Sequence, residues 1–203
     1  MADKKTVRNH WNTKRTAMAV EFYMYDDELW FIKDSTENQA LSEKDTEVIK
    51  KMIDAIRERY PEAYKALSKE YQKSAMNVPY YQFLIVRRFC KCNFGKLDTT
   101  TYDIDNLGRF NFEKVECPLR GECKNEGIIC CPKFNSKLSP AEERVMNLIY
   151  QGFTKEEVGD KLCLSPNTIK QHVRSAYCKL GVHDKGEFVK LAKDNNIFNN
   201  LKH

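Results

Sequence analysis

The sequence predicts an α+β protein, in which a mixed N-terminal domain with a small antiparallel sheet and a cysteine-rich loop precedes an all-α C-terminal domain of four helices. Short alternating apolar runs in the first half are typical of strands, and six cysteines lie between residues 90 and 131. Three helix-start signals then follow in the last third. We therefore expect two domains, residues 1–136 and residues 137–203.

Size and composition exclude several classes of protein. A chain of 203 residues with 41% hydrophobic residues can bury a real core, which excludes global disorder. The longest apolar run, residues 80–86, is far shorter than the roughly 20 residues that span a bilayer, so we expect no membrane segment. The basic start lacks the pattern of a signal peptide. We expect a cytoplasmic protein, where clustered cysteines are better candidates for metal ligands than for disulfides.

The N-terminal domain contains predicted strands, helices and further strands in that order. Residues 20–33 (VEFYMYDDELWFIK) indicate two short strands around an Asp-Asp pair. Residues 42–75 have apolar positions at three-to-four spacing, which predicts a helix, and Pro61 begins a second one. Residues 80–116 have β character with two Gly-containing turns, which predicts a small antiparallel meander.

Each helix of the C-terminal domain carries its own start signal. Ser139 and Thr154 are predicted N-caps with a glutamate three residues later, and Ser165 is an N-cap followed by proline at the first helical position. A connection of only three residues joins the second helix to the third. This order of helix, tight turn and helix predicts a helix-turn-helix domain.

The third helix has a polar face that suits the major groove of DNA. No acidic side chain occurs between residues 162 and 183, and Lys170, Gln171 and Arg174 lie opposite the apolar stripe. Lysine and arginine donate to guanine, and glutamine can bond an adenine edge. The alternative is an ordinary amphipathic core helix with a solvated face, which would need all the helix-start signals to coincide.

The segment LSPAEERVMNLIYQGFTKEEVGDKLCLSPNTIKQHVRSAYCKLGVHDKGEFV resembles the DNA-binding domain of the LuxR family, also called the GerE or FixJ type. The similarity covers about residues 137–198 and includes the TIKQHV and KLGV segments. Gly159 is a departure, because the family usually has alanine there. The resemblance implies a four-helix helix-turn-helix domain that binds double-stranded DNA.

The resemblance also implies roles for individual residues. Lys170, Gln171 and Arg174 would face base edges. Thr168 and Lys179 would lie near phosphates.

A fourth helix often forms the dimer contact in this family. Here residues 185–193, with Phe188, Val189 and Ala192, would supply that contact. The sequence therefore predicts a transcriptional regulator that binds DNA as a homodimer, and RNA polymerase is a second candidate partner.

The cysteine-rich window predicts a metal site. Its loop is too rich in Gly, Pro and charge to form a core, and four thiolates suit either tetrahedral zinc or an iron–sulfur cluster. The expected ligands are Cys92, Cys117, Cys123 and Cys130, with Cys90 and Cys131 as alternates. Zinc is preferred as the commoner metal, with a structural role, although Cys117-Pro118 is similar to cluster ligands, and a cluster would indicate a redox or iron sensor. Buried free thiols are the third interpretation.

Three other functions share part of this sequence pattern. A sigma factor also ends in a helix-turn-helix, but it needs a helical promoter-melting domain that residues 1–136 do not resemble. A metalloprotein with a DNA-localising tail, or an interaction module with structural zinc, would share the same motifs. We expect no enzyme, because the N-terminal domain has one histidine, His10, and no nucleophile-base pair or phosphate loop.

Overall fold

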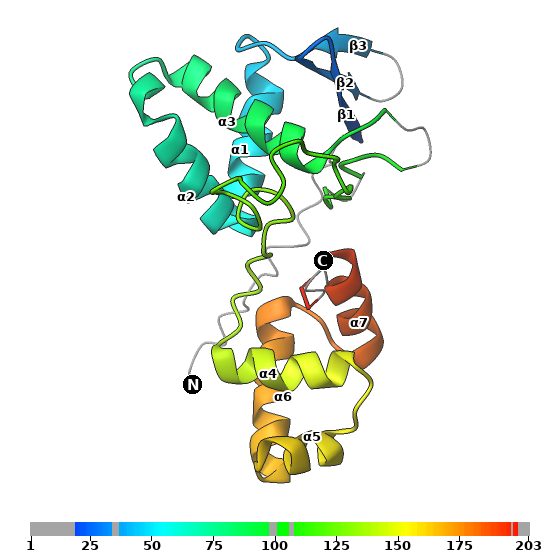
Figure 1. Ribbon diagram of the computed structural model, residues 1–203. Coiled ribbons are helices and arrows are strands. Elements are labelled where there is room, and N and C mark those ends of the chain that lie inside the picture. Colours follow the sequence, from blue (N-terminus) through cyan, green and yellow to red (C-terminus); the bar gives the residue numbers. More distant parts are fainter. Residues whose placement is uncertain (1–18, 34–36, 98–100, 106–107, 196, 199–203) are drawn as a thin grey trace, which may run out of the picture. The chain divides into compact units, whose positions relative to one another are not determined.

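The computed structural model describes residues 19–33, 37–97, 101–105, 108–195 and 197–198. These residues form two compact units, one within residues 19–135 and the other within residues 136–193 (Figure 1). None of the described helices combines the length and the apolar character needed to cross a membrane.

A three-stranded antiparallel sheet begins the first unit. Its strands are β1 (Val20–Tyr25), β2 (Glu28–Lys33) and β3 (Glu37–Ala40), in the order β1-β2-β3. Asp26 and Asp27 both have positive φ, 48° and 59°, so they form the tight two-residue turn that matches strand twist. The two strands predicted around this pair are confirmed. The sequence did not predict β3, because its ENQA sequence is polar and short.

Four helical segments follow the sheet. They are α1 (Thr46–Arg59), α2 (Pro61–Glu70), the short 3-10 helix η2 (Gln72–Ser74) and α3 (Val78–Asn93). The predicted helices within residues 42–75 are confirmed, including the restart at Pro61. Proline has no backbone N–H to donate, which suits the first position of a helix.

Helix α3 corrects the predicted meander over residues 80–116. The side chain of Asn77 caps this helix by accepting from the backbone N–H of Tyr80. Its buried residues repeat at helical spacing and are Ile85, Val86, Phe89, Cys90 and Asn93. Among the described residues from 94 to 116, β pairing is limited to single bridges at Ile104. Strand-forming residue types predicted strands here, but packing against α1 and α2 favours the helix.

Aromatic rings fill the core of the first unit. Tyr60, at the corner between α1 and α2, lies 5.2 Å from Phe112 and 6.0 Å from Phe89, measured between ring centroids. Phe22 of β1 stacks on Phe94 at 5.9 Å. These contacts hold the sheet, the helices and the segment around residue 110 in one core.

The second unit is a bundle of four helices, as predicted. They are α4 (Pro140–Tyr150), α5 (Lys155–Leu162), α6 (Pro166–Leu180) and α7 (Lys185–Asp194). Capping boxes begin α4 at Ser139 and α5 at Thr154, and Ser165 caps α6. The α+β fold class is therefore confirmed. The sheet lies within residues 20–40, and the further strands predicted over residues 80–116 are not formed in the described part of that range.

Candidate nucleic-acid interface and cysteine pocket

The turn between α5 and α6 is tight because of two backbone features. Cys163 ends α5 in the left-handed conformation at φ 53°, and the backbone N–H of Leu164 donates to the carbonyl of Gly159 at 2.9 Å. A Cβ at position 159 would lie only 3.0 Å from the carbonyl oxygen of Leu164. Gly159, which stands where the LuxR family usually has alanine, therefore lets the turn approach α5 closely.

Helix α6 buries one stripe and leaves the opposite face open to solvent. The buried residues are Ile169, Val173, Ala176 and Leu180. Lys170, Gln171 and Arg174 are exposed on the other face, and the first turn has no acidic residue. The hydroxyl of Thr168 lies 2.8 Å from that of the N-cap Ser165, which orders the start of the helix. The predicted base-reading residues thus share one solvent-facing surface.

Glu142 links α4 to α6. Its carboxylate accepts from the backbone N–H of Ser139 at 2.7 Å, from the hydroxyl of Ser175 at 2.6 Å and from Nζ of Lys179 at 2.6 Å. Burial alone would raise the pKa of Glu142, but hydrogen bonds from Lys179, Ser175 and Ser139 outweigh it and lower the pKa to about 2. The ammonium group of Lys179, expected near phosphate, is thus already paired with a carboxylate, although its side chain is 38% exposed.

Helix α7 buries two of its four apolar residues inside the unit. Phe188 is fully buried, with its ring centroid 6.1 Å from that of Tyr177 on α6, and Ala192 is also fully buried. These two residues therefore build the core, which corrects their expected place in a dimer contact. Val189 is half-buried and keeps some surface open.

The first unit contains a cavity of about 520 Å³ at the end of α3. The four expected ligands all line it, Cys92 from α3 and Cys117, Cys123 and Cys130 from the following loop. The alternate Cys90 is fully buried in the core, and Cys131 is not part of the lining. Because α3 is a helix, Cys90 and Cys92 point in different directions, whereas the predicted strand would have placed both on one face.

Asn93 fixes the end of the cysteine loop against α3. Its side-chain amide donates to the carbonyl of Ile129 at 2.8 Å and to that of Phe89 at 2.9 Å, while its oxygen accepts from the N–H of Cys131 at 2.8 Å. Asn93 is fully buried. The predicted strands and turns of residues 80–116 gave no reason to expect a buried amide at this position, because the contacts of Asn93 depend on the end of a helix.

The electrostatics of the cavity favour a neutral thiol at Cys92. Burial raises its pKa to about 11, Arg88 opposes the shift, and the three other lining cysteines add to it. Five basic side chains line the cavity, Arg88, Lys91, Lys96, Lys114 and Arg120, together with Glu113, Glu116 and Glu126. The lining is thus positive as long as the thiols are protonated.

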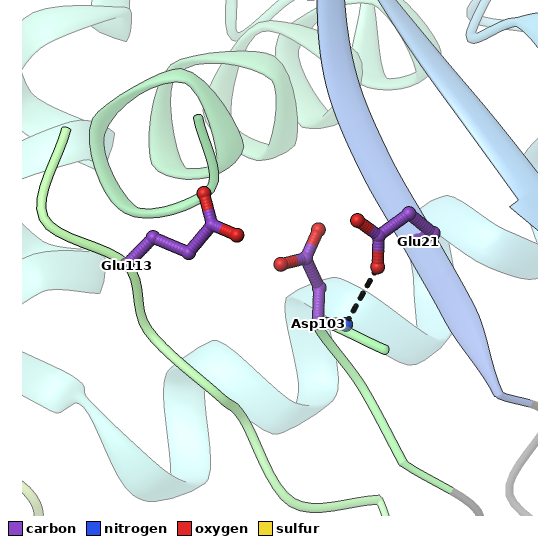
Figure 2. A group of neighbouring side chains, drawn as sticks. All are labelled: Glu21, Asp103 and Glu113. Atoms are coloured by element: carbon purple, nitrogen blue, oxygen red, sulfur yellow. Dashed lines mark hydrogen bonds between the residues drawn. The ribbon is translucent and has the colours of Figure 1, made fainter. Parts of the chain in front are cut away.

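Three carboxylates meet beside the sheet, as Figure 2 shows. One oxygen of each of Glu21, Asp103 and Glu113 lies within 4.8 Å of the others. Glu21 accepts from the N–H of Asp103 at 3.1 Å, Asp103 accepts from that of Phe22 at 2.7 Å, and Glu113 accepts from that of Gly95 at 2.8 Å. These bonds tie an irregular segment to β1 and to the residues that directly follow α3. No local pattern predicts this group, because its members lie far apart in the chain.

The four helices, their caps and the tight turn before α6 define a helix-turn-helix domain. Residues 136–192 match the GerE family, described as bacterial regulatory proteins of the luxR family. The HTH-type transcriptional regulator MalT of Serratia proteamaculans (strain 568) is 38% identical over 58 residues, which cover 29% of this chain and 6% of the relative. This part of the chain is therefore a LuxR-family helix-turn-helix domain, as the sequence predicted. No solved structure matched the chain significantly.

Proposed function

We propose that this protein is a transcriptional regulator that binds double-stranded DNA in the cytoplasm through α6. The observation that carries the proposal is the exposed, acid-free face of α6 on a LuxR-family helix-turn-helix domain. A positive surface is attracted to the phosphate backbone, and an α-helix fits the major groove of B-DNA. The chain spans only 6% of the length of its relative, so the proposal rests on this domain alone.

The side chains of α6 divide into two roles. Lys170, Gln171 and Arg174 are exposed and have donors that suit base edges, so they would provide sequence preference. Thr168 and Lys179 lie at the two ends of the helix, where they would contact phosphates and set its position in the groove.

The test is a selection of bound sequences from randomised duplexes, followed by affinity measurements by fluorescence anisotropy. We expect the triple variant K170A/Q171A/R174A to lose the sequence preference, since each direct contact contributes about 1–3 kcal/mol of discrimination. The double variant K190A/K193A on α7 removes the same net charge and should keep the preference. A triple variant that still selects the same sequence would refute this orientation of α6.

The functional unit is proposed to be a homodimer. One short recognition helix offers few base contacts, so two copies would be needed for useful discrimination, with half-sites about 34–36 Å apart. Val189 remains available on α7 for such a contact, since Phe188 and Ala192 are occupied in the core. RNA polymerase is the partner through which a bound regulator would act.

The N-terminal domain, residues 1–136, is proposed to be a metal-binding regulatory domain, joined to the DNA-binding domain of residues 137–203. Its support is the set of thiols around one cavity, Cys92, Cys117, Cys123 and Cys130. Zinc would give a structural role and an iron–sulfur cluster a sensory one.

A further inference from the structure

The cysteine cavity carries an inference that deepens the metal-binding part of the proposed function and rests on it. We infer that Cys92, Cys117, Cys123 and Cys130 ligate an iron–sulfur cluster rather than a single zinc ion. Three observations support a cluster: the spacing of the thiols, the size of the cavity between them, and a buried donor in its wall.

The described thiols are not gathered as closely as the four ligands of one zinc ion. Four sulfurs at the usual Zn–S distance of about 2.3 Å in a tetrahedron lie roughly 4 Å from one another. Within the part of the chain that the structure describes, no three cysteine Sγ atoms lie within 4.8 Å of one another. A cluster of several iron and sulfide ions spreads its thiolate ligands farther apart than a single ion does.

The cavity between the thiols also fits a larger group. A structural zinc ion has a closed coordination shell that leaves no room at its centre. Here the four cysteines help to line a cavity of about 520 Å³, whose buried apolar walls come from Phe94 and Ile129, whereas Leu119 and Cys117 lie at its exposed side. Apolar walls shield a cluster from water, which is one of the ways a protein sets its reduction potential.

Arg88 supplies a free donor at the cavity wall. Its Nε atom is buried and has no hydrogen-bond partner among the described residues. A buried donor without a partner is costly, and N–H groups that donate to cluster or thiolate sulfur would remove that cost. Arg87, one position earlier, instead pairs with Asp27 at 3.7 Å and does not line the cavity.

The chemistry of assembly balances in charge and protons. A [4Fe–4S] core with charge of about +2 exchanges its labile ligands for four thiols, which release four protons and form four Fe–S bonds. The product carries a charge of about −2, which the excess of basic side chains around the cavity offsets. The iron and sulfide come from a cluster donor, or from ferrous and ferric iron with sulfide during reconstitution in vitro.

The experiment uses the full chain, purified without oxygen and analysed for iron, acid-labile sulfide and zinc. We expect roughly two or roughly four iron atoms per chain with equal sulfide, and visible thiolate-to-iron absorption. The single variants C92S, C117S, C123S and C130S should each bind iron about tenfold or more weakly. Even the loss of a residue that only hydrogen-bonds to a ligand lowers metal affinity by roughly 10–100-fold. The controls C131S and C178S should retain the cluster.

Arg88 has its own test, with a readout that a purely structural role would not move. R88M should lower the reduction potential of the cluster, because a lost cation disfavours the more negative reduced form, whereas R87M should leave it unchanged. Circular dichroism of each variant establishes that the helices are retained.

The outcomes separate this inference from the proposed function. About one zinc per chain without sulfide would overturn the cluster and keep a metal-binding domain. No metal after purification and reconstitution, with all eight thiols titratable in the folded chain, would overturn both. DNA binding measured on the same samples tests the helix-turn-helix domain independently, since neither Cys163 nor Cys178 lines the cavity.

Discussion

Glu142 shows how one carboxylate can serve two elements. It completes the capping box of α4 at Ser139, and it also accepts hydrogen bonds from Ser175 and Lys179 of α6. The capping role followed from the sequence, because an N-cap and a glutamate three residues later are local signals. The contacts with α6 did not, because they depend on how two helices pack.

The lowered pKa of Glu142 predicts a loss of stability in acid. Its pKa is about 2 in the folded domain against 4.5 ordinarily, so the stabilisation is complete above about pH 4.5 and is lost as pH falls toward 2. The difference corresponds to about 3 kcal/mol. Urea unfolding at several pH values should show this slope, and E142Q should remove most of it. The exposed Glu156 provides the control E156Q; an unchanged slope in E142Q would contradict the assignment.

Lys179 is expected to contribute to DNA affinity without contributing to sequence preference. K179A should weaken binding to all duplexes alike and reduce the slope of log affinity against log salt by about one unit. Because Lys179 also pairs with Glu142, the variant should lose some stability, so binding is compared well below its unfolding temperature. If the salt slope stayed the same while affinity fell, the lysine would act only through the fold.

At the scale of elements, the helical form of α3 determines which of its cysteines lines the cavity. The YYQFLIVRRF segment is rich in aromatic and β-branched residues, and such a composition favours strands when only local preference is considered. Burial at helical spacing, from Ile85 to Asn93, and a cap at Asn77 override that preference. The sequence placed all four cavity cysteines in one site from their clustering. It could not choose between Cys90 and Cys92 on geometry, because the choice depends on the helix.

Asn93 is predicted to hold the cysteine loop in place. N93A would leave the carbonyl of Ile129 and the N–H of Cys131 without their partner, at a cost of about 1–3 kcal/mol for each buried group. We expect a matching fall in the free energy of unfolding by urea. N125A removes an exposed bond to Glu70 and should change that free energy by less than about 1 kcal/mol. Equal effects of the two variants would argue against a clamp at Asn93.

A substitution on helix α7 tests the proposed homodimer most directly. V189E places a charge on the half-buried position without touching the buried Phe188, so the domain should stay folded while self-association is lost. Sedimentation should report a monomer, and operator affinity should fall by roughly tenfold or more, since one half-site then binds alone. K190A changes the net charge equally and should remain dimeric. Full-strength binding by a monomeric V189E would exclude α7 from the interface.

At the scale of the whole molecule, each unit has its own buried core. The helix-turn-helix unit was predictable almost entirely, because its caps, turn and stripes are local patterns. In the first unit, the carboxylates of Glu21, Asp103 and Glu113 and the aromatic core join segments that are distant in sequence, and a single sequence gives no means to pair such segments.

Metal removal should affect the two units differently. We expect calorimetry of the metal-loaded chain to resolve two transitions, and a chelator to lower the midpoint of one of them. The helix-turn-helix transition should keep its midpoint, because its core contains no cavity thiol. The single substitution C117S in the full chain should lower the same midpoint as the chelator does. A single transition that shifts as a whole would show that the two units unfold together.

The bridge between Val20 and Ile104 has a consequence for how the chain folds. Phe22 donates to a carboxylate 81 residues ahead of it, whereas the contacts among α4, α5 and α6 close within one short stretch of chain. Folding slows as the sequence separation of native contacts grows, because the ends of a long loop must meet first. During synthesis, the hairpin of β1 and β2 can form early, but the contacts of β1 with Asp103 and Ile104 can form only after those residues leave the ribosome. In refolding experiments the helix-turn-helix should form in a fast phase, and the aromatic core in a slower one that reducing conditions leave unchanged.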